Sequence, residues 1–454
     1  MTLTASPLAR ALRRAALVLL PVVLAACGGS GGDDDEGGGA ADCSVASRQV
    51  WLRDYMADWY FWYRIAPRPD PAGYTSLDSY FDALLYTGSS ADFPADRWSY
   101  YDSTEDFNRF YGEGRTLGYG VSVAGYEVEG APDQPLYVRA VEPQSDAAAR
   151  GVVRGDEIVS INGVGAAALI SDGSFSVLTA ANAGQTMTLV LRRNGATRTV
   201  TVTATEYALT PVPTSSVVTT VGGRKLGYVV VKDMVSQVGT PLAQAFAGFA
   251  SAGVDEVVLD LRYNGGGLVS VATTVGSYVT GSAKSGQTFA SLLYNDRHSD
   301  QNQSFRFQSP ASAAGVARVF VLVGPRTCSA SEQVINGLRG VGVEVIAIGD
   351  TTCGKPVGFL PQDDACGRTY SVVNFESVNA RYEGRYFDGF APTCAVAEDF
   401  KQPLGAAGEP LLAAAANYAD SGACPAVARA RSLSAPRAGW RQPEPGEHRG
   451  MIAR

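Results

Sequence analysis

Apolar and polar positions follow a different period in three parts of the chain, and the pattern is clearest in the C-terminal half. Residues 207–424 switch between short β-branched runs and longer stretches of helical spacing. Runs that are apolar at every position are typical of strands buried on both faces. The expected strands are 227–231, 256–261, 319–323 and 343–348, and the expected helices include 241–252 and 329–340. This alternation predicts an α/β layered core over residues 207–424.

Residues 113–206 carry short runs with a period of two, which is typical of paired strands with one buried face. The expected strands are 136–141, 157–161, 187–191 and 197–203, and a short helix is expected over 145–150. This region is therefore predicted to be a separate β-rich module.

Residues 43–112 are predicted to form a helical segment. Aromatic residues recur at helical spacing within 50–63, and 77–85 is a second expected helix. The aromatic positions are Trp51, Tyr55, Trp59 and Trp62. We interpret this stripe as packing, since aromatic side chains contribute large buried surfaces.

Both ends of the chain differ from these three regions. Arg10, Arg13 and Arg14 precede an apolar stretch, 15–26, that is too short to span a bilayer. Residues 1–27 are thus predicted to be a signal peptide and 28–42, rich in Gly and Asp, a flexible tether. Residues 425–454 lack a buried periodicity and are predicted to be a flexible tail.

Composition narrows the class of protein. The 454 residues suggest about two to four domains, and 46% hydrophobic with 18% charged residues indicates a mostly globular chain. A formal net charge of −8 argues against nucleic acid as the main partner.

The cysteines indicate an oxidising compartment. Apart from Cys27, six remain, and an even count in an exported chain is typical of disulfides. Proximity in sequence favours Cys353–Cys366 and Cys394–Cys424, which leaves Cys43 with Cys328. A zinc site is the alternative, but there is no C-x-x-C and there are only two histidines, so neither a metal nor a cofactor is expected.

Three segments that could carry chemistry each follow an expected strand, where sites form in open α/β sheets. They are Asp260-Leu-Arg-Tyr-Asn-Gly-Gly-Gly267, Thr327-Cys-Ser-Ala-Ser-Glu332 and Thr351-Thr-Cys-Gly-Lys-Pro356. The glycines can present bare N–H groups to an oxyanion, and a serine at a helix N-terminus lies near its partial positive charge. Of five lysines, Lys355 alone lies in a strand-end loop, where burial can turn an amine into a general base.

Each segment also has a structural interpretation. Ser329 with Glu332 is a capping box, and Lys355 can be a solvated loop lysine. The glycines can bind phosphate, although no G-x-x-x-x-G-K-[ST] is present. Other serine-hydrolase classes lack their residues: His298 and His448 are poor triad members, the only G-x-S-x-G centres on Ser30, and no S-x-x-K occurs.

Together the D-L-R-x-N-G-G-G run, the S-A-S-E run and the following G-K resemble the C-terminal processing peptidases. The resemblance covers about residues 43–424 and implies a core related to the crotonase and ClpP architecture. It implies Ser329 as nucleophile and Lys355 as general base, with Glu332 and Thr352 orienting the lysine. The oxyanion hole would be formed by the N–H groups of Ala330 and a glycine, Gly266. Cys328, Cys353 and Pro356 depart from the family pattern, as does the Ser-to-Lys interval of 26 residues.

Two further resemblances complete the predicted function. The R-G-D-x-I-x-x-I-N-G motif within 147–163 is similar to the corresponding sequence of PDZ domains. In that family the carboxylate-binding loop would be Leu117, Gly118, Tyr119, Gly120 and Val121. Leu24-Ala-Ala-Cys27 resembles the lipobox of bacterial lipoproteins, which implies lipidation of Cys27 and a membrane-anchored protein facing the periplasm or the cell surface.

The sequence thus predicts a Ser-Lys endopeptidase with PDZ-assisted recognition of substrate C-termini. Its partners would be peptides or protein tails. A catalytically inactive, lipid-anchored PDZ adaptor is the alternative, and a crotonase-like acyl-transfer enzyme is a second one.

Overall fold

The computed structural model describes residues 42–173, 175–426 and 450–453. The predicted signal peptide, almost all of the tether and most of the predicted tail lie outside these residues. Among the described residues, no helix has the length and apolar character needed to cross a membrane.

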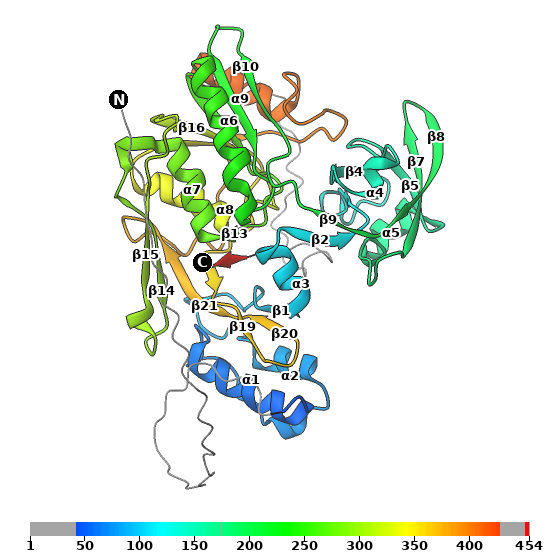
Figure 1. The fold of residues 1–454 in the computed structure, drawn as a ribbon, viewed down its shortest axis with the longest axis vertical. Coiled ribbons are helices and arrows are strands. Elements are labelled where there is room, and N and C mark those ends of the chain that lie inside the picture. The colour runs from blue at the N-terminus through cyan, green and yellow to red at the C-terminus, as the bar shows by residue number, and fades with distance from the viewer. Residues whose placement is uncertain (1–41, 174, 427–449, 454) are drawn as a thin grey trace, which may run out of the picture. The chain divides into compact units, whose positions relative to one another are not determined.

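The core is built on a six-stranded sheet in which the four predicted apolar runs lie side by side (Figure 1). Its order is β10-β11-β12-β16-β17-β22, with β11, β12, β16, β17 and β22 parallel and β10 antiparallel. The strands are β10 Ser215–Thr219, β11 Lys225–Val230, β12 Glu256–Asp260, β16 Arg318–Val323, β17 Glu344–Gly349 and β22 Cys394–Ala395. The prediction of an α/β core is confirmed.

Helices cover both faces of this sheet, which explains why its strands are apolar throughout. Alternate strand residues such as Val257 and Val321 pack with one group of helices, whereas Val258 and Phe320 pack against the last helix. The helices are α6 Gly239–Ala252, α7 Val269–Thr280 and α8 Ala330–Gly340 on one face, and α9 Pro410–Ser421 on the other.

A second six-stranded sheet, of order β13-β23-β18-β21-β14-β15, lies next to α7 and α8. Its strands are β13 Gly267–Leu268, β23 Met451–Ile452, β18 Val357–Phe359, β21 Val373–Val378, β14 Thr288–Tyr294 and β15 Gln303–Arg306. Figure 1 shows β23, in red, beside β13. The flexible tail predicted for 425–454 is therefore wrong for 450–453. A two-residue strand is too short to leave a periodic signal, and its position depends on its partners.

The β-rich module has a core of its own, formed by residues such as Val138, Ile158 and Leu189. Its sheet runs β3-β4-β5-β7-β8, with β6 paired to β5, and β2 pairs with β9 in a separate ribbon. The elements are β2 Arg115–Gly118, β3 Val121–Val123, β4 Leu136–Val141, α4 Asp146–Ala149, β5 Glu157–Ile161, β6 Val164–Gly165, α5 Ala166–Asp172, β7 Thr186–Arg193, β8 Ala196–Thr203 and β9 Thr205–Ala208.

The N-terminal segment is helical, as predicted, but it also contributes a strand. Its elements are α1 Val45–Trp59, α2 Leu77–Leu84, β1 Tyr100–Ser103, α3 Thr104–Phe107 and the π-helical turn η2 Asn108–Gly112. β1 pairs with β20 Arg368–Ser371, and β20 pairs with β19 Gln362–Asp363. The aromatic stripe is packed: Trp51 stacks on Tyr55 with ring centroids 5.4 Å apart. Trp62 is buried beyond the end of α1 rather than on it.

Three disulfides join Cys43 to Cys366, Cys328 to Cys353 and Cys394 to Cys424. The prediction is confirmed for Cys394–Cys424 and wrong for the other two bridges. Cys328 and Cys353 follow the neighbouring parallel strands β16 and β17, so the sheet brings their Cα atoms to 5.2 Å. Sequence proximity was the wrong criterion because it ignores this adjacency.

Candidate active site

Ser329 occupies a strained turn between β16 and α8. Its backbone has φ 61° and ψ −116°, a conformation that non-glycine residues rarely adopt. The side chain is fully buried, and Oγ has no hydrogen-bond partner among the described residues. The first turn of α8 has the layout of a capping box, but only the bond from the Ser329 N–H to Glu332 has normal hydrogen-bond geometry. The predicted nucleophile is therefore a buried hydroxyl that capping does not engage.

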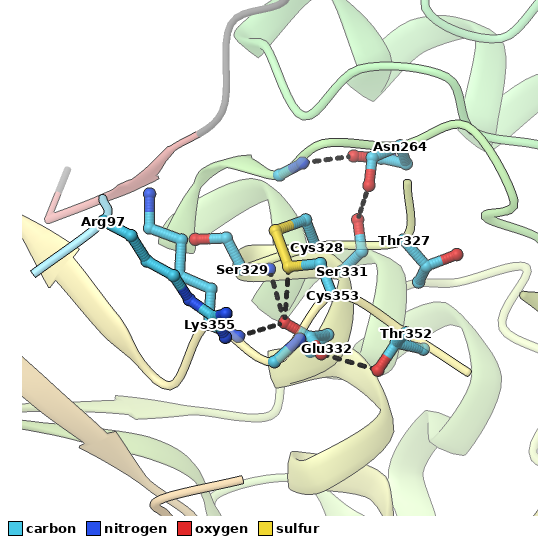
Figure 2. Close-up of a disulfide and its surroundings, with 12 residues drawn as sticks. Arg97, Asn264, Thr327, Cys328, Ser329, Ser331, Glu332, Thr352, Cys353 and Lys355 are labelled. Carbon is cyan, nitrogen blue, oxygen red and sulfur yellow. Dashed lines mark hydrogen bonds between the residues drawn. A yellow bond between two sulfur atoms is a disulfide. The ribbon is translucent and has the colours of Figure 1, made fainter. Parts of the chain in front are cut away.

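Lys355 lies in the loop that follows β17 and is also buried, at 1% exposure. Its Nζ stands 3.9 Å from the ring centroid of Phe359, a cation–π contact in a low-dielectric site. Figure 2 shows the Ser329 hydroxyl pointing towards the side of the site where Lys355 lies. The alternative that Lys355 is a solvated loop lysine is therefore wrong, since the side chain is enclosed by protein.

Glu332 holds the two segments together through their main chains (Figure 2). Its Oε2 accepts hydrogen bonds from the N–H groups of Ser329 at 2.9 Å and Lys355 at 2.8 Å. Its Oε1 accepts from the Thr352 hydroxyl at 2.6 Å and the Gly354 N–H at 2.8 Å. Burial raises the pKa of Glu332, and these hydrogen bonds oppose that rise. Glu332 and Thr352 thus position the loop that carries the lysine.

The N–H groups of the glycine run have different partners. The Gly266 N–H donates to Asn264 Oδ1 at 2.9 Å, whereas the Gly267 N–H donates to the carbonyl oxygen of Gly450. A Cβ on Gly266 would lie 3.0 Å from Ser329 Cβ and 3.1 Å from the Ala330 nitrogen. The backbone therefore needs glycine at 266, which lies beside Ala330, whereas the N–H group of the run that is directed at Gly450 belongs to Gly267.

The Cys328–Cys353 disulfide joins the residue before Ser329 to the lysine loop (Figure 2). The ligand atoms of Cys328, Cys353 and Glu332 lie within 4.8 Å of one another, a separation that fits a metal. Because the two sulfurs are bonded to each other, they are not thiolate ligands. The group is a covalent clamp on the site rather than a metal centre.

Comparison with known proteins agrees with this geometry. The sequence model of peptidase family S41 matches residues 225–381, that of the peptidase S41 N-terminal domain matches 48–100, and that of the PDZ domain matches 112–192.

Residues 225–381 belong to peptidase family S41.

Solved and curated members of family S41 resemble much of the chain. A putative S41 protease from Bacteroides fragilis is 25% identical, with a TM-score of 0.65 over 82% of this chain and 97% of its own. The carboxyl-terminal-processing protease of a Picosynechococcus species is 26% identical over 52% of this chain and 55% of that protein. The chloroplastic C-terminal processing peptidase of Tetradesmus obliquus is 27% identical over 58% and 57%. The chain thus matches little more than half the length of these curated relatives.

Several residues that support this S41 site were not predicted. Asn264 binds the Gly266 N–H, and its carbonyl accepts from the Ser331 hydroxyl at 3.0 Å. Arg262, in the same run, makes two hydrogen bonds to the buried carboxylate of Glu409, at 2.7 and 3.0 Å. The D-L-R-Y-N run pointed to Arg262 and Asn264, but Glu409 lies in no motif and is found only through the fold.

The PDZ domain of this S41 chain contacts the core through Arg154. Its guanidinium donates to Tyr263 Oη and to Glu398 Oε1, both at 2.7 Å. Lys232 is partly buried and pairs with Glu142 of the PDZ domain at 2.6 Å. The loop predicted to bind carboxylates lies between β2 and β3. There the Tyr119 side chain is buried in the PDZ core, and Gly120 adopts φ 79°.

Proposed function

We propose that this protein is a serine endopeptidase that cleaves peptides or protein tails by a Ser-Lys mechanism. The observation that carries the proposal is the buried Ser329 hydroxyl, which has no hydrogen-bond partner in the part of the chain that the structure describes, in a site that also encloses Lys355. The match of residues 225–381 to family S41 supports the same activity, as does the similarity to two C-terminal processing proteases.

The geometry supports acyl transfer in two steps, acylation of Ser329 and hydrolysis of the acyl-enzyme. Neutral Lys355 removes the proton of Ser329 Oγ, which attacks the scissile carbonyl carbon. The N–H groups of Ala330 and Gly267 stabilise the oxyanion without reorganising, because the glycine run and α8 fix them. Lys355 then protonates the leaving amine, and water hydrolyses the acyl-enzyme by the reverse proton path.

The PDZ domain would deliver substrates by their C-termini. Peptides add as a strand at a PDZ sheet edge while backbone N–H groups of the preceding loop hold the terminal carboxylate. The loop from Leu117 to Val121 has the glycines that such a loop needs. We expect apolar C-terminal residues to be preferred, and a C-terminally amidated peptide to bind more weakly than the free acid in a titration.

The protein would act outside the cytoplasm, anchored by lipid at Cys27. The Leu24-Ala-Ala-Cys27 run supports lipidation, and three disulfides support an oxidising compartment. Expression in a bacterium supplied with a labelled fatty acid tests this proposal. Label on the wild-type chain and none on Cys27→Ala would support it, whereas unlabelled wild type would contradict it.

The catalytic proposal is tested with the form lacking residues 1–27, using an unstructured protein with an apolar C-terminal tail. We expect the parent form to cleave this substrate and to be labelled by an active-site serine probe. Ser329→Ala should lose both cleavage and labelling, and Lys355→Ala should lose cleavage.

Lys225→Ala is the matched control, because Lys225 is exposed at the amino end of β11, away from the strand ends that form the site. It should cleave like the parent. Full activity of a folded Ser329→Ala protein would contradict the assignment of the nucleophile.

A further inference from the structure

A segment of the chain itself occupies the groove beside Ser329. Strand β23, Met451–Ile452, is inserted between β13 and β18 and runs parallel to both. The Ala453 N–H donates to the Phe359 carbonyl at 3.0 Å, and the Gly267 N–H donates to the Gly450 carbonyl. Backbone pairing of this kind is how an extended peptide binds to a sheet edge.

One carbonyl of this segment lies at the candidate oxyanion hole. The Gly450 oxygen is 2.3 Å from the position that a Cβ on Gly266 would take, and Ser329 Cβ is 3.0 Å from the same position. The nitrogen of Ala330 is 3.1 Å from it. The Gly450 carbonyl is therefore adjacent both to the nucleophile and to the two N–H groups assigned to the hole.

The side chains after this carbonyl are held in apolar surroundings. Met451 and Ile452 are fully buried in the main core. The Met451 sulfur accepts a weak hydrogen bond from Gln333 Nε2 at 3.5 Å. A Cβ on Gly358 would lie 2.6 Å from the Met451 oxygen, so glycine at 358 admits the strand.

On the Gly450 side of the Gly450–Met451 bond, the space is narrow. A Cβ on Gly450 would lie 2.9 Å from the hydroxyl of Tyr111, which is buried. A glycine is accommodated there without displacing that hydroxyl, and a branched residue is not. The groove thus selects a small residue on one side of the Gly450–Met451 bond and large apolar residues on the other.

We propose that the protein cleaves its own chain between Gly450 and Met451, so that its first substrate is this segment; the inference rests on the Ser-Lys activity proposed above. Ser329 Oγ bonds to the Gly450 carbonyl carbon as its proton passes to Lys355. The bond from that carbon to the Met451 nitrogen then breaks, and Lys355 returns the proton to the nitrogen. Water hydrolyses the ester and leaves a carboxylate on Gly450 and a free amine on Met451.

The geometry is compatible with cleavage within one molecule. Twenty-five residues separate Cys424, which is bonded to Cys394, from Gly450. At about 3.3 Å per residue, such a chain reaches roughly 80 Å when extended, which exceeds the dimensions of a domain of this size. The segment of one chain can therefore enter the groove of the same chain.

The test is the intact mass of the full-length chain, purified in detergent, together with C-terminal sequencing. We expect the wild type to lose the mass of Met451–Arg454 and to end at Gly450, and Ser329→Ala to keep these residues. Gly450→Val should remain uncleaved. Gly446→Val, the same change four positions earlier, should be cleaved like the wild type. An equal loss of cleavage in both variants would overturn the assignment of Gly450.

The same preparations are assayed on an added unfolded protein, which separates this inference from the proposed function. Cleavage of the added protein by a wild type that keeps residues 451–454 overturns self-cleavage and leaves the peptidase proposal intact. If only a chain truncated after Arg449 cleaves the added protein, the segment blocks the groove and is not a substrate, which also overturns self-cleavage. If neither form cleaves anything, both proposals fall.

Discussion

At the scale of single residues, one buried carboxylate organises the site. Glu332 accepts hydrogen bonds from groups on both sides of it, including the main-chain N–H groups of Ser329 and Lys355. A carboxylate with this many donors is fixed in one rotamer, and it fixes the two backbones in turn. Ser329 and Lys355 are thus set relative to each other before any substrate binds, which is the preorganisation that the proposed acyl transfer needs.

Removing one of these donors should weaken both the fold and catalysis. Thr352→Val deletes the hydroxyl that donates to Glu332 and accepts from the Phe390 N–H. We expect a loss of about 1.5–3 kcal/mol in the free energy of unfolding and a decrease of about 10- to 100-fold in kcat with KM little changed. Urea unfolding and steady-state kinetics measure these effects. Thr352→Ser keeps the hydroxyl and should behave like the wild type; an equal defect in Thr352→Ser would show that the methyl group matters instead.

A second carboxylate, Asp102 in β1, should make stability depend on pH. Burial raises the pKa of Asp102 to about 6, and the nearby charge of Asp106 adds to the rise. The folded state therefore binds the proton more tightly than the unfolded state. The stabilisation is complete below about pH 4 and is lost as the pH rises to about 6.

Asp102→Asn should raise the free energy of unfolding at pH 7.5 by about 1–2 kcal/mol, and by much less at pH 4. Urea unfolding at both pH values tests this difference. A stabilisation that is the same at both pH values would rule out titration of Asp102 as its cause.

The shared location of the candidate catalytic residues was predictable because their motifs and their strand-end positions agree. Ser329 and Lys355 each follow a strand of one parallel sheet, so the fold brings them to one edge. Which glycine N–H group is available at the proposed oxyanion hole could not be predicted from the sequence. The Asn264 side chain accepts from the Gly266 N–H, whereas the Gly267 N–H donates to Gly450.

At the scale of elements, the sequence predicted strands and helices well where burial is complete. The predicted strand 319–323 lies in β16, and the predicted helix 329–340 corresponds to α8 with Ser329 as its N-cap. Both elements are packed on both faces, so their apolar pattern indicates a single type of element. Disulfides and two-residue strands were predicted poorly. Cys353 pairs with Cys328 and β23 enters a sheet because of tertiary neighbours that no local pattern encodes.

The Cys328–Cys353 bridge should matter for catalysis as well as for stability. It spans 25 residues in sequence, and the Cys394–Cys424 bridge spans 30, so the loop-closure model gives each about 3.5 kcal/mol. Replacing either pair by serine should therefore cost similar stability. Only Cys328→Ser with Cys353→Ser should also lower kcat, because that bridge adjoins the nucleophile and the lysine loop.

Thermal unfolding and kinetics of the two double variants make this comparison. Equal loss of activity in both variants would show that activity follows stability alone. Normal kcat in the Cys328→Ser, Cys353→Ser variant would show that Glu332 is sufficient to hold the loop.

At the scale of the whole molecule, the PDZ domain and the catalytic core share a buried polar contact. Arg154 of the PDZ domain reaches Tyr263 in the D-L-R-Y-N run, and its second partner, Glu398, also pairs with Arg262 at 3.3 Å. The segment that we propose to form the oxyanion hole is thus in direct contact with the domain that would receive the substrate's C-terminus.

Arg154→Ala should loosen this contact and leave Glu398 with one fewer partner. We expect a loss of about 3 kcal/mol in the free energy of unfolding, faster limited proteolysis near residues 206–214, and a lower kcat. Arg150→Ala, which removes an exposed arginine paired with Asp146 on the same domain, is the matched control and should change little. Equal proteolysis of the two variants would mean that Arg154 does not hold the domains together.

The Cys43–Cys366 bridge closes a covalent ring of the chain, because it joins positions 323 residues apart. The ring contains the whole PDZ domain, the strands that lead to Ser329, and Lys355 itself. A single cut anywhere within it would leave both fragments tethered, so the molecule would still migrate as one species until it is reduced. Cleavage of surface loops would then leave the fragments joined by the disulfide. The strand ends that carry Ser329 and Lys355 would stay together after a cut that separates an unbridged chain into two pieces.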